Sequence, residues 1–92
     1  MGMVEVLHSK KEITKFQILV EIAAHQPNIR QKEIAEKIGV TPQAVSEYIK
    51  ELIDEGLVHS DGRVSYTVTN HGIEWIQETA FELKRYAEYV VE

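Results

Sequence analysis

Several features are absent from this sequence, and each absence narrows the class of protein. The 92 residues include no cysteine, which excludes a disulfide framework and a thiolate metal site. No apolar run approaches the roughly 18 residues of a membrane-spanning helix. The first residues, "MGMVEVLHSKK", lack the basic start and apolar core of a signal peptide. We therefore expect a cytoplasmic protein with no membrane partner.

Basic side chains are fewer than acidic ones, 10 against 15, so the formal net charge is −5. Proteins that bind nucleic acid usually carry a basic surface, so this balance argues weakly against nucleic acid. The charge is uneven, however: residues 70–92 hold two basic and five acidic side chains. Much of the acidity therefore falls on a C-terminal element that need not face a ligand. The hydrophobic fraction of 43% is typical of a globular chain, so we expect residues 1–92 to form one small domain.

The residues that usually carry catalysis form no recognisable set. There is no Ser-His-Asp arrangement, glycine-rich phosphate loop or catalytic carboxylate pair, and the four histidines are scattered. His71 and Glu74 are spaced as a possible ligand pair on a helix, but no cysteine or further histidine lies nearby. The sequence therefore predicts a protein that is not an enzyme and has no cofactor or metal.

Two amphipathic helices are predicted in the first half of the chain. Over residues 11–25 the apolar side chains recur every three or four positions, and Pro27 disfavours helix at the residue before it. A shorter helix over residues 30–38 ends at Gly39, which can adopt the left-handed conformation. The expected inward residues are Ile13, Phe16, Leu19, Val20, Ile22 and Ala23 in the first helix, and Ile34, Ala35 and Ile38 in the second.

A third helix is clearly marked at both ends. Thr41 can cap it, Pro42 suits its first position, and Gly56 stops it. We expect a β-hairpin to follow, with strands over residues 57–60 and 63–68 joined by a two-residue turn at Asp61-Gly62. The residues of the third helix expected to point inward are Ala44, Val45, Ile49, Leu52 and Ile53.

The fourth predicted helix, about residues 70–91, is long for so small a domain. Thr69 can cap it, and Gly72 in its first turn is a mild defect. Ile73, Ile76, Ala80, Leu83, Ala87 and Val90 recur with the two-in-seven period of a coiled coil. The alternative is that this face packs within its own domain, as its first half does in part. The predicted dimer interface consists of Ile76, Ala80, Leu83, Tyr86, Ala87 and Val90.

The order of these elements resembles that of winged helix-turn-helix transcription regulators of the MarR-like kind, found in archaea and bacteria. The resemblance covers about residues 12–75 and centres on "QKEIAEKIGVTPQAVSEYIKELIDEGLV", the Asp61-Gly62 turn and "TVTNHG". It implies a mainly α fold with a small β-hairpin, in the order helix-helix-helix-strand-strand-long helix. It also implies sequence-specific binding of double-stranded DNA by a homodimeric transcriptional regulator.

The predicted DNA contacts follow from the helix-turn-helix. The amino-terminal half of its second helix contacts base edges, and Gln43, Glu47 and Lys50 suit adenine, cytosine and guanine respectively. Glu51, Asp54 and Glu55 lie in the other half, where the helix leaves the groove. The residues predicted to read bases are Gln43, Ser46, Glu47 and Lys50; those predicted to hold phosphate are Arg30, Lys32, Thr41 and Arg63, flanked by Lys10, Lys11 and Lys15.

Other interpretations stay open at this point. Each of these polar side chains could simply be solvated. The domain could be a protein-interaction module whose acidic surface contacts a basic partner, or the DNA-binding part of a longer regulator. Nothing in the sequence requires a small-molecule effector; if one binds, we expect its pocket between the helices of the dimer.

Overall fold

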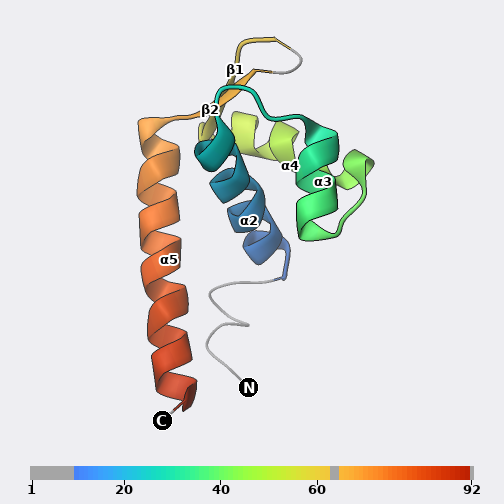
Figure 1. Cartoon of the computed structure of the whole chain (residues 1–92). Coiled ribbons are helices and arrows are strands. Elements are labelled where there is room, and N and C mark those ends of the chain that lie inside the picture. Colours follow the sequence, from blue (N-terminus) through green and yellow to red (C-terminus); the bar gives the residue numbers. More distant parts are fainter. Residues whose placement is uncertain (1–9, 63–64, 92) are drawn as a thin grey trace.

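The computed structural model describes residues 10–62 and 65–91, of which residues 86–91 are described by their backbone alone. Residues 1–9 and Arg63, which was predicted to hold phosphate, lie outside this part. The elements are α2 (Lys10–His25), α3 (Gln31–Ile38), α4 (Pro42–Asp54), β1 (Val58–Ser60), β2 (Tyr66–Val68) and α5 (Asn70–Val91) (Figure 1). This order confirms the predicted mainly α class with a small hairpin. Across the described ranges, no helix is long and apolar enough to cross a membrane.

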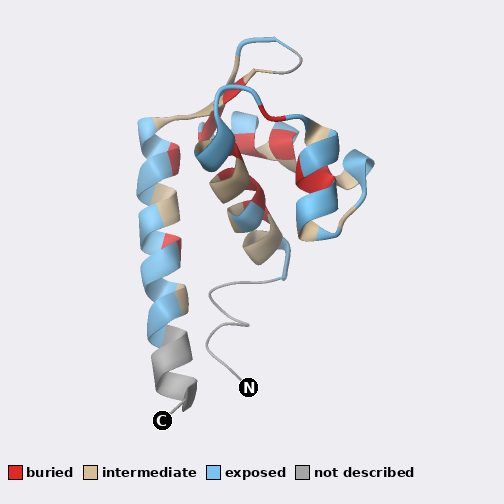
Figure 2. Cartoon of the chain, viewed as in Figure 1, coloured by how far each residue is buried: buried red, intermediate tan, exposed pale blue. Residues whose placement is uncertain are grey.

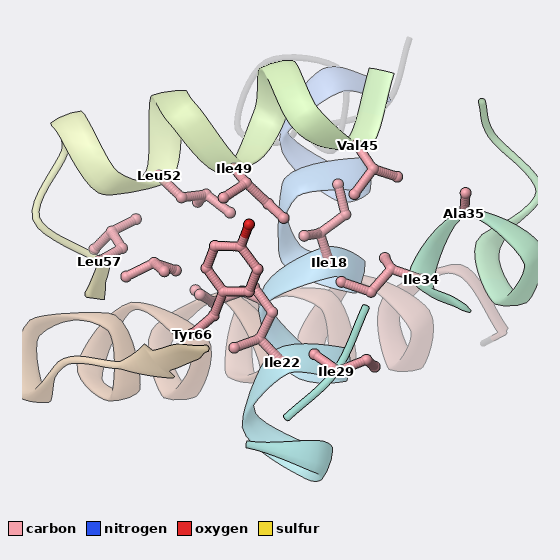
Figure 3. Packing of buried hydrophobic residues seen from close by; sticks show 12 residues of the cluster. Ile18, Ile22, Ile29, Ile34, Ala35, Val45, Ile49, Leu52, Leu57 and Tyr66 are labelled. Atoms are coloured by element: carbon pink, nitrogen blue, oxygen red, sulfur yellow. The ribbon is translucent and has the colours of Figure 1, made fainter. Parts of the chain in front are cut away.

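The core lies where α2 meets α3, α4 and the hairpin. Ile18 and Ile22 of α2 are fully buried, and Figure 3 shows α4 directing Val45 and Ile49 toward this centre. The sequence prediction omitted Ile18 from the inward face of α2. It also placed Ile53 inward, which is wrong, because this side chain is 37% exposed. Val45, Ile49 and Leu52 already complete the buried stripe of α4, and Ile53 turns away from it.

The ends of α3 and α4 follow local chemistry closely. Arg30 is the residue before α3 rather than its first residue, so the predicted start was one residue early. The Glu33 carboxylate accepts a hydrogen bond from the Arg30 backbone N–H at 3.0 Å, which is one half of a capping box. At α4, the Thr41 hydroxyl accepts from the Ala44 N–H at 3.1 Å, and Pro42 occupies the first turn, as predicted.

The hairpin differs from its prediction in the turn. Ser60 pairs with Tyr66 and Val58 with Val68, so residues 61–65 connect the strands and the predicted two-residue turn is wrong. The Asp61 N–H donates to the Ser65 carbonyl oxygen at 2.9 Å. Tyr66 is only 5% exposed, and its place in the core determines the register more strongly than the Asp-Gly pair does.

Helix α5 runs antiparallel to α2 and packs against α2 and β2 (Figure 1). The Gly72 N–H donates to the Thr69 hydroxyl at 2.9 Å, which confirms the predicted cap. Gly72 itself is not a defect. A Cβ atom at this buried position would collide with the Leu57 carbonyl oxygen and lie 2.6 Å from Val68 Cγ1. The glycine therefore permits the close approach of α5 to the hairpin.

The residues of the predicted seam of α5 differ in how far they are buried within the protomer. Ile76 and Leu83 are half-buried, whereas Ile73 and Ala80 are exposed. Figure 2 shows the buried and half-buried side of α5 facing α2. Thr79, which is 3% exposed, belongs to this inner side. The side chains of Tyr86, Ala87 and Val90 lie outside the described residues.

Candidate nucleic-acid interface

The turn between α3 and α4 fixes the two helices relative to each other. Gly39 adopts the left-handed conformation with φ of 77°, which residues with a side chain rarely adopt. Its N–H donates to the Ala35 carbonyl oxygen at 2.9 Å, and the Val40 N–H reaches the same oxygen at 3.2 Å. Ile34 and Ala35 are buried in the core. Helix α3 and its turn therefore hold the amino end of α4 in a defined position.

The predicted base-reading side chains are brought together on the outer side of α4. Gln43, Glu47 and Lys50 are exposed, and Ser46 is half-buried. They lie within the first nine residues of the helix, which spans Pro42–Asp54, and opposite the buried stripe. This arrangement leaves amide, hydroxyl, carboxylate and ammonium groups available to a ligand. Whether they read bases is not tested by the geometry and stays a prediction.

The predicted phosphate contacts lie at the amino ends of α3 and α4. Arg30 and Lys32 are exposed around the start of α3, where backbone amides and the helix dipole favour an anion. Glu33 in the same turn opposes that effect. Thr41 is exposed; because its oxygen accepts the capping bond, its hydroxyl proton can still be donated to a phosphate oxygen.

One of the three flanking lysines, Lys15, is held in an ion pair and does not lie free on the surface. Lys15 is only 7% exposed, and its Nζ atom lies 2.9 Å and 2.8 Å from the two carboxylate oxygens of Glu55. Lys15 is therefore not a free contact for DNA. Lys11 Nζ lies 3.2 Å from Glu51 Oε1, but Lys11 is exposed, and its flanking role stays a prediction. Lys10 is exposed as well.

These ion pairs reduce the effect of the acidic residues at the carboxyl end of α4 on the exposed face of its amino half. Glu51 lies in the carboxyl half of α4 and Glu55 directly follows the helix, and both receive counterions from α2. Their field at the amino half of the helix is correspondingly reduced. Glu47 lies among the predicted base-reading residues and would repel phosphate there.

Sequence reasoning missed how the hairpin is held. The Tyr66 N–H donates to the Pro27 carbonyl oxygen at 3.0 Å, and the Val68 N–H donates to Gln26 Oε1 at 2.9 Å. Gln31 Nε2 donates to the Tyr66 hydroxyl at 2.9 Å. No sequence pattern signals these contacts, because residues 35 or more positions apart meet.

The possible metal ligands are not gathered into a site in the described part of the chain. His71 Nδ1 and Glu74 Oε1 lie 3.9 Å apart on the exposed surface of α5. The searched residues contain no group of three histidine, cysteine or acidic side chains placed to hold a metal ion.

Comparison with known proteins identifies the class to which this architecture belongs. The family model for winged helix-turn-helix DNA-binding domains matches residues 11–59, which is more than half of the chain. The chain belongs to this family. An uncharacterized protein of Methanocaldococcus jannaschii is 48% identical over 81 residues, which make up 88% of this chain and 31% of that protein. The chain thus spans less than a third of this relative's length.

Solved structures with the same fold include MarR proteins. The multiple antibiotic-resistance repressor MarR of Listeria monocytogenes aligns with a TM-score of 0.70 at 15% identity, covering 85% of this chain and 55% of the repressor. A MarR family protein of Mycobacterium tuberculosis, solved with salicylic acid, aligns with a TM-score of 0.70 at 23% identity, covering 85% and 62% respectively. These matches confirm the MarR-like winged-helix fold predicted from the sequence.

Proposed function

We propose that the protein is a homodimeric transcriptional regulator that binds double-stranded DNA in a sequence-specific manner and has no catalytic activity. The observation that carries the proposal is the division of α4 into two faces. Val45, Ile49 and Leu52 are buried in the core, while the opposite face presents polar side chains at the amino half of the helix. That half is the part of a helix-turn-helix that enters the major groove. We assign its place of action to the cytoplasm.

The charge distribution supports modest affinity with strong salt dependence. The net charge is −5, so long-range attraction to DNA is weak, and binding depends on a few local contacts with phosphate. A gel-shift titration with a mixture of genomic duplexes at low salt tests DNA binding itself. A shift that disappears at high salt supports the proposal, whereas no shift at low salt favours the alternative, a protein-interaction module with an acidic surface.

Replacing Arg30 or Lys32 with alanine is expected to weaken binding to specific and random DNA alike. Both cations are exposed near the start of α3, and removing one cation that neutralises a phosphate should reduce the slope of log affinity against log salt by about one unit. Affinities measured at several salt concentrations give that slope. Lys84→Ala, an exposed change on α5, is the matched control, and an unchanged slope in a variant removes that residue from the interface.

Helix α5 is the element that we propose joins two protomers. At about 1.5 Å per residue its 22 residues extend about 33 Å, against about 24 Å for the 16 residues of α2 beside it. Phe81 is 61% exposed and Ile73 38% exposed, and apolar surface of this kind is buried when two copies associate. A two-fold dimer presents two α4 helices to two half-sites, which suits a pseudo-palindromic operator.

The dimer is tested most cleanly at Ala80, which belongs to the predicted interface and is exposed on the protomer. Ala80→Glu adds a charge without disturbing the core of one copy, so the fold should persist while the mass measured by light scattering falls to that of a monomer. Glu78→Lys changes the charge at an exposed position of the same helix, two residues from Ala80 and therefore on the opposite side, and should keep the wild-type mass. If Ala80→Glu also keeps that mass, the interface lies elsewhere on the chain.

A further inference from the structure

The wing, which we define as β1, β2 and the described residues Asp61, Gly62 and Ser65 between them, is attached at its base to the segment between α2 and α3. Along β2, the N–H groups of Tyr66 and Val68 donate to the Pro27 carbonyl oxygen and to the Gln26 side chain. Strand β1 pairs with β2 through the register described above. One edge of β2 is therefore bonded to β1, and its other N–H groups are bonded to residues 26–27. The segment that contains these two residues leads directly into α3.

The hydroxyl of Tyr66 makes the connection to α3 itself. The ring is almost fully buried, and Figure 3 shows it between residues of α4 and Ile22 of α2. Its hydroxyl accepts a hydrogen bond from Gln31, the first residue of α3. Gln31 lies between Arg30 and Lys32 in the chain, the two residues proposed to hold phosphate. One side-chain pair thus joins the first residue of β2 to the proposed phosphate-binding end of α3.

We infer that Gln31 and Tyr66 are positioning residues that hold the wing at a fixed distance from the amino end of α3, so that both can contact one DNA duplex. This inference rests on the proposed function. Neither side chain needs to touch DNA. A two-stranded hairpin is marginally stable by itself, so the contacts at its base must define its direction. Without this bond the wing has more freedom, and ordering it on binding reduces affinity.

The chain contains no cysteine, which permits a direct measurement of the wing's position. Asp61→Cys, an exposed position on the wing, gives a single thiol to which iron-EDTA can be attached. Hydroxyl radicals produced there cleave nearby nucleotides of a bound duplex. Tyr66→Phe then removes one oxygen and keeps the ring in the core, and Gln31→Ala removes the other partner. Tyr48→Phe removes the same atom from a half-buried tyrosine of α4 and is the control.

We expect the labelled parent and the Tyr48→Phe control to cleave a narrow set of nucleotides. Tyr66→Phe and Gln31→Ala should each give weaker and broader cleavage, with affinity for DNA lowered roughly three- to ten-fold, as the loss of one hydrogen bond predicts. The preference for the best site over random DNA should not change, because α4 keeps its position. If Gln31 and Tyr66 only stabilised the fold, the folded variants would show the same cleavage pattern as the parent.

Two results would contradict the account at different levels. If both variants remain folded by circular dichroism and cleave the same nucleotides as strongly as the parent, the positioning role of the pair is excluded while DNA binding stands. If the labelled parent fails to bind duplex DNA at low salt, the proposed function itself fails.

Discussion

Gly72→Ala is expected to destabilise the protein by about 2–3 kcal/mol, as overpacking in a filled interior does. Intrinsic helix propensity predicts the opposite sign, because alanine in a helix is favoured over glycine by about 1 kcal/mol. The packing effect should dominate. The added Cβ would collide with the Leu57 carbonyl oxygen, which already accepts a hydrogen bond from the Thr69 N–H at 3.0 Å. Relief would require α5 to move away from the hairpin.

Urea denaturation monitored by circular dichroism measures this change in the free energy of unfolding. Gln77 is exposed on the same helix, so the difference between Gln77→Gly and Gln77→Ala reports helix propensity without packing. We expect Gln77→Ala to be the more stable of that pair, and Gly72→Ala to be less stable than wild type. A stabilised Gly72→Ala variant would show that α5 does not approach the hairpin as closely as described.

Gln43→Ala is expected to weaken binding to the best DNA site by about 1–3 kcal/mol, with little change on random DNA. Gln43 is exposed near the amino end of α4, and a glutamine amide can form two hydrogen bonds with adenine in the major groove. Alanine removes those bonds but leaves the phosphate contacts in place. The loss should therefore appear as reduced discrimination between sequences.

Parallel titrations with the preferred duplex and a scrambled duplex measure that discrimination. Gln77→Ala makes the same substitution on an exposed surface of α5 and should change neither affinity. Equal losses on both duplexes for Gln43→Ala would show that this side chain contributes to general affinity and does not read bases.

The elements with strong local signals could be predicted from the sequence. Thr41 and Pro42 begin α4, Gly39 ends α3, and Thr69 caps α5, because each acts through its immediate neighbours in the chain. The apolar periodicity of the helices then defined their buried sides in outline. These local features are sufficient for the order of elements and for the winged-helix class.

The errors arose where a distant contact outweighs the local signal. Asp61-Gly62 suggests a tight turn, but the burial of Tyr66 selects a different register. Gly72 looks unfavourable in a helix until the Leu57 carbonyl oxygen is placed beside it. The charge of Lys15 suggests a surface position, although this residue continues the inward positions of Ile18 and Ile22 on α2.

The part of the candidate site that depends on local sequence could also be predicted. The outward side of α4 follows from its helical period, so the exposure of Gln43, Glu47 and Lys50 could be anticipated. The pairing of Lys15 with Glu55 and of Gln31 with Tyr66 could not, because these partners are 40 and 35 residues apart. Both pairs join elements, and only the folded chain brings them together.

The central claim, that α4 reads sequence in duplex DNA, is tested most directly by selecting genomic fragments with the purified protein at one stated low salt concentration. The account predicts enriched fragments that share a motif with two-fold symmetry, and loss of that enrichment for Gln43→Ala while weak binding to bulk DNA remains. Recovery of fragments in proportion to the input, with no shared motif and no difference between wild type and Gln43→Ala, would contradict it.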